Sequence, residues 1–179
     1  MTTSEQPETV TVGGASGGER ADLIGTLALH RSFLRYTTRD MTDDQARQRP
    51  TASELCLGGL IKHVAMTERQ WAKFIVGGAE AMGVGEAEEG WADGFQMLEG
   101  ETLDGLLEQY AEVARQTEEI VSALPDLGVA HALPEAPWFE PGATWSARRV
   151  LYHLIGETSQ HAGHADIIRE SLDGAKTMG

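Results

Sequence analysis

Apolar side chains recur three, four and seven residues apart along most of this chain, which is the spacing that lines one face of an α-helix. Four long stretches show this pattern, and residues that start or stop helices bound them. The first begins at Arg20, the second runs from Ser53 to Gly77–Gly78, the third from Thr102 to Leu124, and the last from Thr144 or Ser146 to about Leu172. Together they predict an all-α four-helix bundle with long crossover loops.

The segments between these stretches are expected to be connections. A short helix is predicted at Asp43–Arg49, with Thr42 as its N-cap and Pro50 at its end. Residues 77–100 are rich in glycine and acidic side chains and predict a long connection over one end of the bundle. Residues 125–143 hold four of the six prolines, and the tryptophan and phenylalanine in their middle indicate a loop that packs. No stretch alternates strongly enough to predict a strand.

Composition sets the domain count and excludes one class of partner. Residues 1–19 are poor in large apolar groups and predict a mobile N-terminal tail, which leaves a single expected domain over residues 20–175. The chain carries 28 acidic and 14 basic side chains, so its net charge is −14. A surface this acidic repels phosphate backbones, and we therefore expect no nucleic-acid partner.

The single cysteine and the lengths of the apolar runs bear on where in the cell the protein is expected. The single cysteine cannot form an intramolecular disulfide, which fits a reducing compartment. No apolar run approaches the roughly 20 residues that a membrane-spanning helix needs. The first 19 residues lack the basic start and apolar run of a secretory signal. These features predict a soluble cytoplasmic protein without a membrane partner.

Four potential metal ligands lie on the predicted last helix. Glu157 and His161 are four residues apart, about 40° around a helix and one turn along it, so both side chains aim at one neighbouring volume. His164 lies about 20° from Glu157, and His153 precedes Glu157 by one turn. This spacing also suits a solvated helix face with an occasional hydrogen-bonded histidine. His63, between apolar neighbours on the second helix, favours the metal interpretation, because buried polar groups tend to pair or to bind an ion.

Other polar residues have a structural interpretation beside a functional one. Cys56, near a helix start, is expected to pack as a small buried residue. His131, in the proline-rich loop, is expected to be solvated. Arg148 and Arg149 begin the last helix, where the helix dipole disfavours them, and either an anionic substrate or a carboxylate partner would account for one of them.

Two segments resemble one known family. Residues 55–71 (LCLGGLIKHVAMTERQW) resemble the second helix of the DinB-like superfamily, and residues 148–174 (RRVLYHLIGETSQHAGHADIIRESLDG) closely resemble its last helix. The resemblance spans residues 20–174 and is strongest to the actinobacterial branch of mycothiol-dependent S-transferases and maleylpyruvate isomerase. It implies a four-helix bundle with up-down-down-up topology, often dimeric.

The same resemblance implies a metal triad of His63, Glu157 and His161. Many members of the superfamily have histidine at the position of Glu157, and glutamate there is similar to mycothiol-dependent maleylpyruvate isomerase. His164 occupies the place of a frequent glutamine, which implies a residue that supports the ligands or an auxiliary ligand. His153 is expected to pack beside the ligands or to support them.

Two histidines and one carboxylate leave positions on a metal ion open to water or substrate, which is typical of a catalytic site. Zn²⁺ suits this ligand set best, with Ni²⁺, Fe²⁺ and Mn²⁺ as alternatives. The resemblance implies a transferase or isomerase that uses a low-molecular-weight thiol, mycothiol, against an electrophilic small molecule, and that forms a homodimer. The alternatives are a non-enzymatic, stress-associated metal-binding bundle and a metal hydrolase that needs no thiol.

Overall fold

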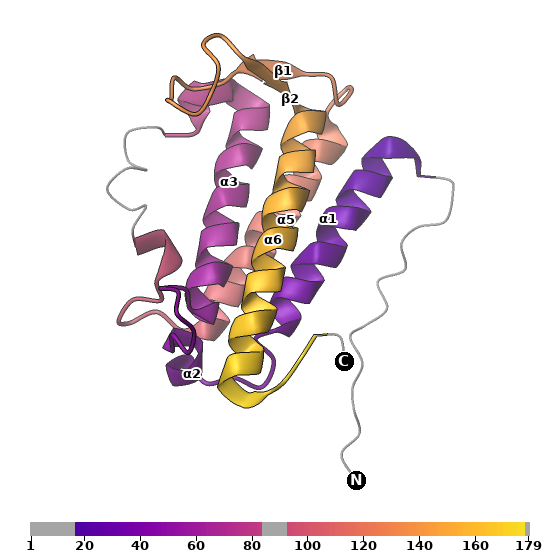
Figure 1. Ribbon diagram of the computed structural model, residues 1–179. Coiled ribbons are helices and arrows are strands. Elements are labelled where there is room, and N and C mark those ends of the chain that lie inside the picture. Colours follow the sequence, from indigo (N-terminus) through magenta and orange to yellow (C-terminus); the bar gives the residue numbers. More distant parts are fainter. Residues whose placement is uncertain (1–16, 84–92, 178–179) are drawn as a thin grey trace.

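The computed structural model describes residues 17–83 and 93–177 and contains four long helices (Figure 1). These are α1 (Gly18–Tyr36), α3 (Leu57–Ala81), α5 (Leu103–Ala123) and α6 (Ala147–Asp173). The shorter elements are α2 (Asp43–Arg47), the 3-10 helix η1 (Asp93–Phe95) and the strands β1 (Ala130–Ala132) and β2 (Thr144–Ser146). The predicted all-α bundle is confirmed. No helix in the described ranges is long and apolar enough to cross a membrane.

Contacts at both ends show that α1 and α6 run in the same direction, side by side (Figure 1). At their amino ends the guanidinium of Arg148 donates two hydrogen bonds to the carboxylate of Glu19. At their carboxyl ends Arg169 Nη1 donates to the backbone carbonyls of Thr37 and Arg39, at 2.8 and 2.7 Å. Arg148, for which two partners were open, therefore pairs with a carboxylate.

The other two long helices run opposite to α1 and α6. Arg20, at the start of α1, donates to the carbonyl of Leu124 just after the end of α5, at 2.8 Å. Near the start of α3, Lys62 forms a 2.7 Å ion pair with Glu101, which precedes α5. Helices α3 and α5 are therefore parallel. This is the up-down-down-up topology that the resemblance implied.

The bundle interior consists of two apolar clusters and a buried ion pair. One cluster gathers around Leu34, Leu60 and Ile61, and the other around Leu27, Phe74 and Leu151. The ion pair joins Arg31 of α1 to Glu68 of α3, whose side chain has no exposed surface. Arg31 contacts both carboxylate oxygens of Glu68, and its Nη1 donates to Glu118 of α5 at 2.7 Å. A buried charge needs such a partner, so this pair fixes the relative positions of three helices.

Local hydrogen bonds explain where most helices begin and end. Thr42, Thr102 and Ser146 each accept a hydrogen bond from the third residue of the helix that follows, as N-cap residues do, and Gly174 ends α6 with a φ of 78°. The prediction that Ser53 caps the second long helix is wrong. Its hydroxyl lies 2.9 Å from that of Thr51, with which it forms a local hydrogen bond. Helix α3 begins four residues after Ser53, so this hydroxyl does not cap it.

The long regular part of α3 breaks where the sequence predicts. At Gly78 the backbone leaves the helical conformation, with a φ of 69° and a ψ of −159°, and only a short further helical turn continues to Ala81. The expectation of no strand is wrong, since β1 and β2 pair antiparallel with His131 opposite Trp145. His131 is not solvated: its Nε2 lies 3.2 Å from the carbonyl oxygen of Ile75, and its ring packs close to Gly78. Three-residue strands are too short for an alternating pattern to be recognised.

Candidate metal centre

His63, Glu157 and His161 come together where α3 packs against α6. His63 lies in the second turn of α3, and the other two lie one turn apart on α6. One ligand atom of each residue lies within 4.8 Å of those of the other two. His161 Nε2 is 3.4 Å from Glu157 Oε2, and the ring centroids of His63 and His161 are 4.9 Å apart. Within the described ranges this is the one group of three or more such side chains close enough to hold a metal ion.

The two imidazoles are shielded from water, whereas the carboxylate is not. His63 and His161 are 6 % and 7 % exposed, while the side chain of Glu157 is 30 % exposed. A metal ion bound here would therefore be held from the interior of the bundle. It would face solvent or substrate on the side of Glu157, as an open catalytic site does.

Burial and mutual charge keep the donors in the states that bind a metal ion. The pKa of His63 is lowered to about 4, mainly because burial disfavours the imidazolium and further because His161 is close. The pKa of Glu157 is lowered by its hydrogen bond to His161, against the opposing effect of burial. At neutral pH the site therefore offers a neutral imidazole at His63 and a carboxylate at Glu157, which are the ligating forms.

Phe95 of η1 covers His63. The two rings are stacked, with centroids 3.8 Å apart and an angle of 20° between their planes. The backbone of η1 can come this close because α3 begins with Leu57-Gly58-Gly59. A side chain at Gly59 would overlap the carbonyl group of Phe95, and one at Gly58 would overlap Met97. Two glycines in the first turn of α3 therefore allow the ring of Phe95 to lie over His63.

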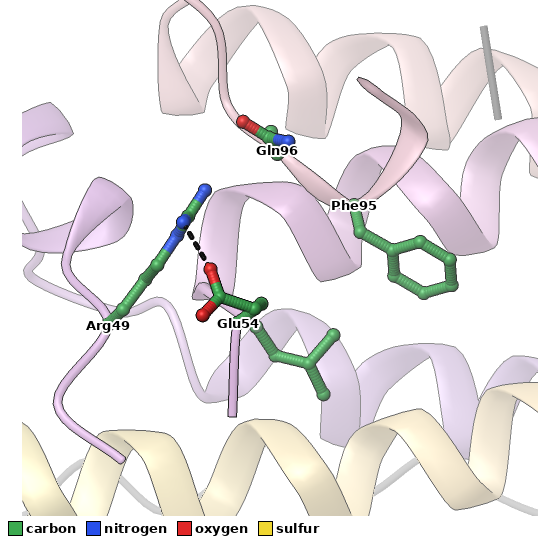
Figure 2. A pocket seen from close by; sticks show the side chains of 5 residues that line it. Arg49, Glu54, Phe95 and Gln96 are labelled. Carbon is green, nitrogen blue, oxygen red and sulfur yellow. Dashed lines mark hydrogen bonds and ion pairs between the residues drawn. The ribbon is translucent and has the colours of Figure 1, made fainter. Parts of the chain in front are cut away.

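Phe95 also lines a small pocket (Figure 2). Its volume is about 310 Å³, and it is lined by Arg49, Glu54, Leu55, Phe95 and Gln96. Figure 2 shows Arg49 and Glu54 joined at one side of the pocket, and their ion pair is 2.7 Å long. Phe95 is the residue that this pocket and the surroundings of His63 have in common.

The other histidines that the sequence singled out lie around the triad and not within it. His164 Nδ1 is 3.4 Å from His161 Nδ1, on the next turn of α6. His153 packs edge-on against Trp71 and Trp145, with ring centroids 5.0 and 5.3 Å away. Its pKa is lowered, chiefly by burial. His164 therefore contacts the candidate ligand His161. His153 instead belongs to an aromatic cluster with Trp71 and Trp145.

The sequence did not reveal Phe95 as part of the site. It follows a segment, residues 84–92, outside the described ranges, and no spacing rule connects it to His63. The available signal was the pair Gly58–Gly59. Glycine weakens a helix, so two in succession in a first turn indicate that another segment approaches closely.

Comparison with known proteins adds one finding to this geometry. A family model described as mycothiol-S-transferase matches residues 22–174, which include all four long helices apart from the first four residues of α1. No curated protein and no solved structure was found to match the chain.

Proposed function

This chain belongs to the mycothiol-S-transferase family, and we propose that it joins the sulfur of mycothiol to an electrophilic small molecule at a metal centre held by His63, Glu157 and His161. The observation that carries the proposal is the convergence of these three donors from two helices. Two buried imidazoles and a carboxylate are an unfavourable combination in a bundle interior unless they pair with one another or share a cation. Their arrangement supports Zn²⁺, with Ni²⁺, Fe²⁺ and Mn²⁺ as alternatives.

A divalent metal ion bound at this site would lower the pKa of a thiol that binds to it and so supply a thiolate near neutral pH. The protein's own part is to position and to exclude water. His63 and Phe95 close the inner side of the site, and Glu157 borders the side from which a substrate enters. Transfer forms a carbon–sulfur bond while the bond from the attacked carbon to its leaving group breaks; the leaving group departs with that electron pair, and the thiol proton passes to it or to solvent. The pocket lined by Phe95 offers room for part of a substrate.

The test compares the wild-type protein with His63→Ala, His161→Ala and a matched control, His30→Ala. His30 lies on α1, with its ring centroid 6.1 Å from that of Phe33, and it is not a member of the group of converging donors. After dialysis without chelator, elemental analysis should find about one metal ion per chain in wild type and control, and little in the two triad variants. Conjugation of mycothiol to an electrophile, followed by mass spectrometry, should show the same division.

Two results would contradict the proposal. If the wild-type protein binds none of the four metal ions after reconstitution, the proposed metal centre does not exist. A loaded protein that hydrolyses substrates without any thiol, and conjugates none, would replace the transferase with a metal hydrolase.

A homodimer and a cytoplasmic location belong to the same proposal and stay predictions. Large apolar side chains on the surface support a subunit interface, since Trp138, Ile167 and Tyr152 are 77 %, 61 % and 53 % exposed. Sedimentation equilibrium of the purified protein would give twice the chain mass if the dimer forms.

A further inference from the structure

The two ring nitrogens of His161 face different partners. Its Nε2 lies 3.4 Å from Oε2 of Glu157, on the side of the triad. Its Nδ1 lies 3.4 Å from Nδ1 of His164, three residues later on the same helix. His161 is buried and His164 is half-buried.

An imidazole that ligates a metal ion through one nitrogen carries its proton on the other. Nε2 of His161 faces Glu157, so it is the nitrogen that can share an ion with Glu157 and His63. Nδ1 must then hold the proton and needs an acceptor, because a buried donor without a partner is costly. The atom that faces it is the Nδ1 of His164, which accepts when its own proton is on Nε2.

We propose that His164 is a positioning residue for the metal centre. It accepts a hydrogen bond from Nδ1–H of His161 and thereby fixes both the tautomer and the ring orientation in which His161 binds through Nε2. The inference rests on the proposed function, because it assumes that the triad binds a metal ion. It decides between the two roles that the sequence left open for His164, supporting residue or auxiliary ligand, in favour of the first.

The place of His164 in the structure supports this choice. His164 is not among the three residues whose ligand atoms converge. Its ring stands at 61° to that of His161, with 5.4 Å between centroids, and the two Nδ1 atoms are the polar atoms that approach each other. The geometry is that of a hydrogen bond between imidazoles, at the long end of the range.

The experiment replaces His164 by two residues of similar size. Asparagine places its Oδ1 where histidine has Nδ1, so His164→Asn keeps an acceptor, whereas His164→Leu removes it. Zn²⁺ affinity is measured by competition with a chromophoric chelator, in the absence of thiol and electrophile. We expect His164→Leu to weaken Zn²⁺ binding about 10- to 100-fold, as loss of a partner of a metal-bound histidine does, and His164→Asn to bind close to wild type. Equal affinity in all three proteins, or an equal loss in both variants, would overturn the proposal.

A second readout reports the tautomer directly. In ¹⁵N-labelled, Zn²⁺-loaded wild type, long-range ¹H–¹⁵N spectra should show a proton on Nδ1 of His161 and the metal on Nε2. Binding through Nδ1 would overturn the assignment. Thermal unfolding of the metal-free variants separates a general loss of stability from a loss of affinity.

These results are distinguishable from failure of the proposed function. Zn²⁺ binding that ranks as expected, without thiol transfer, would leave the inference standing and remove the transferase. Thiol transfer by the wild type, with all three proteins binding Zn²⁺ equally, would support the transferase and overturn the inference about His164. A wild type that binds no metal ion would overturn both.

Discussion

Substituting Gly59 by alanine tests whether the close approach of η1 to α3 holds Phe95 over His63. Gly59 is the third residue of α3, and its backbone faces the backbone of η1 directly. An added Cβ would overlap the carbonyl group of Phe95 and lie 3.0 Å from the backbone nitrogen of Gln96. Backbone atoms cannot rotate out of the way as a side chain can. The substitution therefore must displace η1 from α3, or strain both.

The magnitude follows from a matched control. Gly25→Ala, in the middle of α1, adds a Cβ that meets nothing within 4 Å. It should raise the free energy of unfolding by about 0.5–1 kcal/mol, the ordinary advantage of alanine over glycine in a helix. Gly59→Ala gains part of the same advantage but carries an overpacking cost of about 1–3 kcal/mol. The difference between the two variants isolates this steric cost, and Gly59→Ala should be the less stable.

Two assays on the metal-free protein check this reasoning. Urea unfolding followed by circular dichroism gives the free energy of unfolding of each variant. NMR titration gives the pKa of His63, which is about 4 in wild type because the imidazole is buried. In Gly59→Ala, displacement of Phe95 should let water reach His63 and raise its pKa toward 6.5. If Gly59→Ala is as stable as Gly25→Ala and the pKa of His63 does not change, the reasoning is refuted.

Three further predictions concern the interior and a helix start. The pKa of His63 is lowered from 6.5 to about 4, so the unfolded chain binds a proton at a higher pH than the folded one. The free energy of unfolding of the metal-free protein should therefore fall by up to about 3 kcal/mol as the pH drops from 6.5 to 4, and His63→Leu should remove this part of the slope in urea unfolding. Arg31→Met leaves Glu68 buried without its cation and should cost about 3–5 kcal/mol, whereas adding Glu68→Leu should recover much of it; a loss below about 1 kcal/mol for Arg31→Met would contradict this. Ser146→Ala removes the cap of α6 and should lower thermal stability by about 1 kcal/mol, with helix content unchanged at low temperature.

The helix boundaries that the sequence predicted well are those set by neighbouring residues. Thr102 and Ser146 bond to the backbone three residues on, and Gly174 adopts the left-handed conformation that ends α6. Each of these devices lies within a few residues of sequence. The spacing of apolar residues also predicted which face of each helix is buried. Four long helices with one buried face each pack most simply as a bundle.

The errors have two causes: nearby side chains that compete for one helix start, and a contact between residues far apart in the sequence. Ser53 has the chemistry of an N-cap, but its hydroxyl is engaged with Thr51, and the thiol of Cys56 accepts the hydrogen bond from Gly59 instead. His131 lies in a proline-rich loop that looks solvated, and yet it pairs in a two-stranded sheet and contacts the end of α3. His131 and Ile75 are 56 positions apart in the sequence, so a local pattern contains no record of their contact.

In the candidate site, too, some residues could be predicted from the sequence and others could not. Spacing placed Glu157 and His161 on one side of one helix, and its apolar neighbours made His63 a candidate on another. The resemblance then joined the three residues into a triad. The ring of Phe95 stacks on His63, whose pKa is lowered mainly by burial, and Phe95 comes from a third element whose position no periodicity predicts. The sequence nevertheless contains one sign that a segment packs close to His63. Consecutive glycines at the start of α3 weaken the helix, and they are compensated only if something packs against the bare backbone. In a helix that also carries a candidate ligand one or two turns on, such a pair indicates a segment that shields the ligand from water.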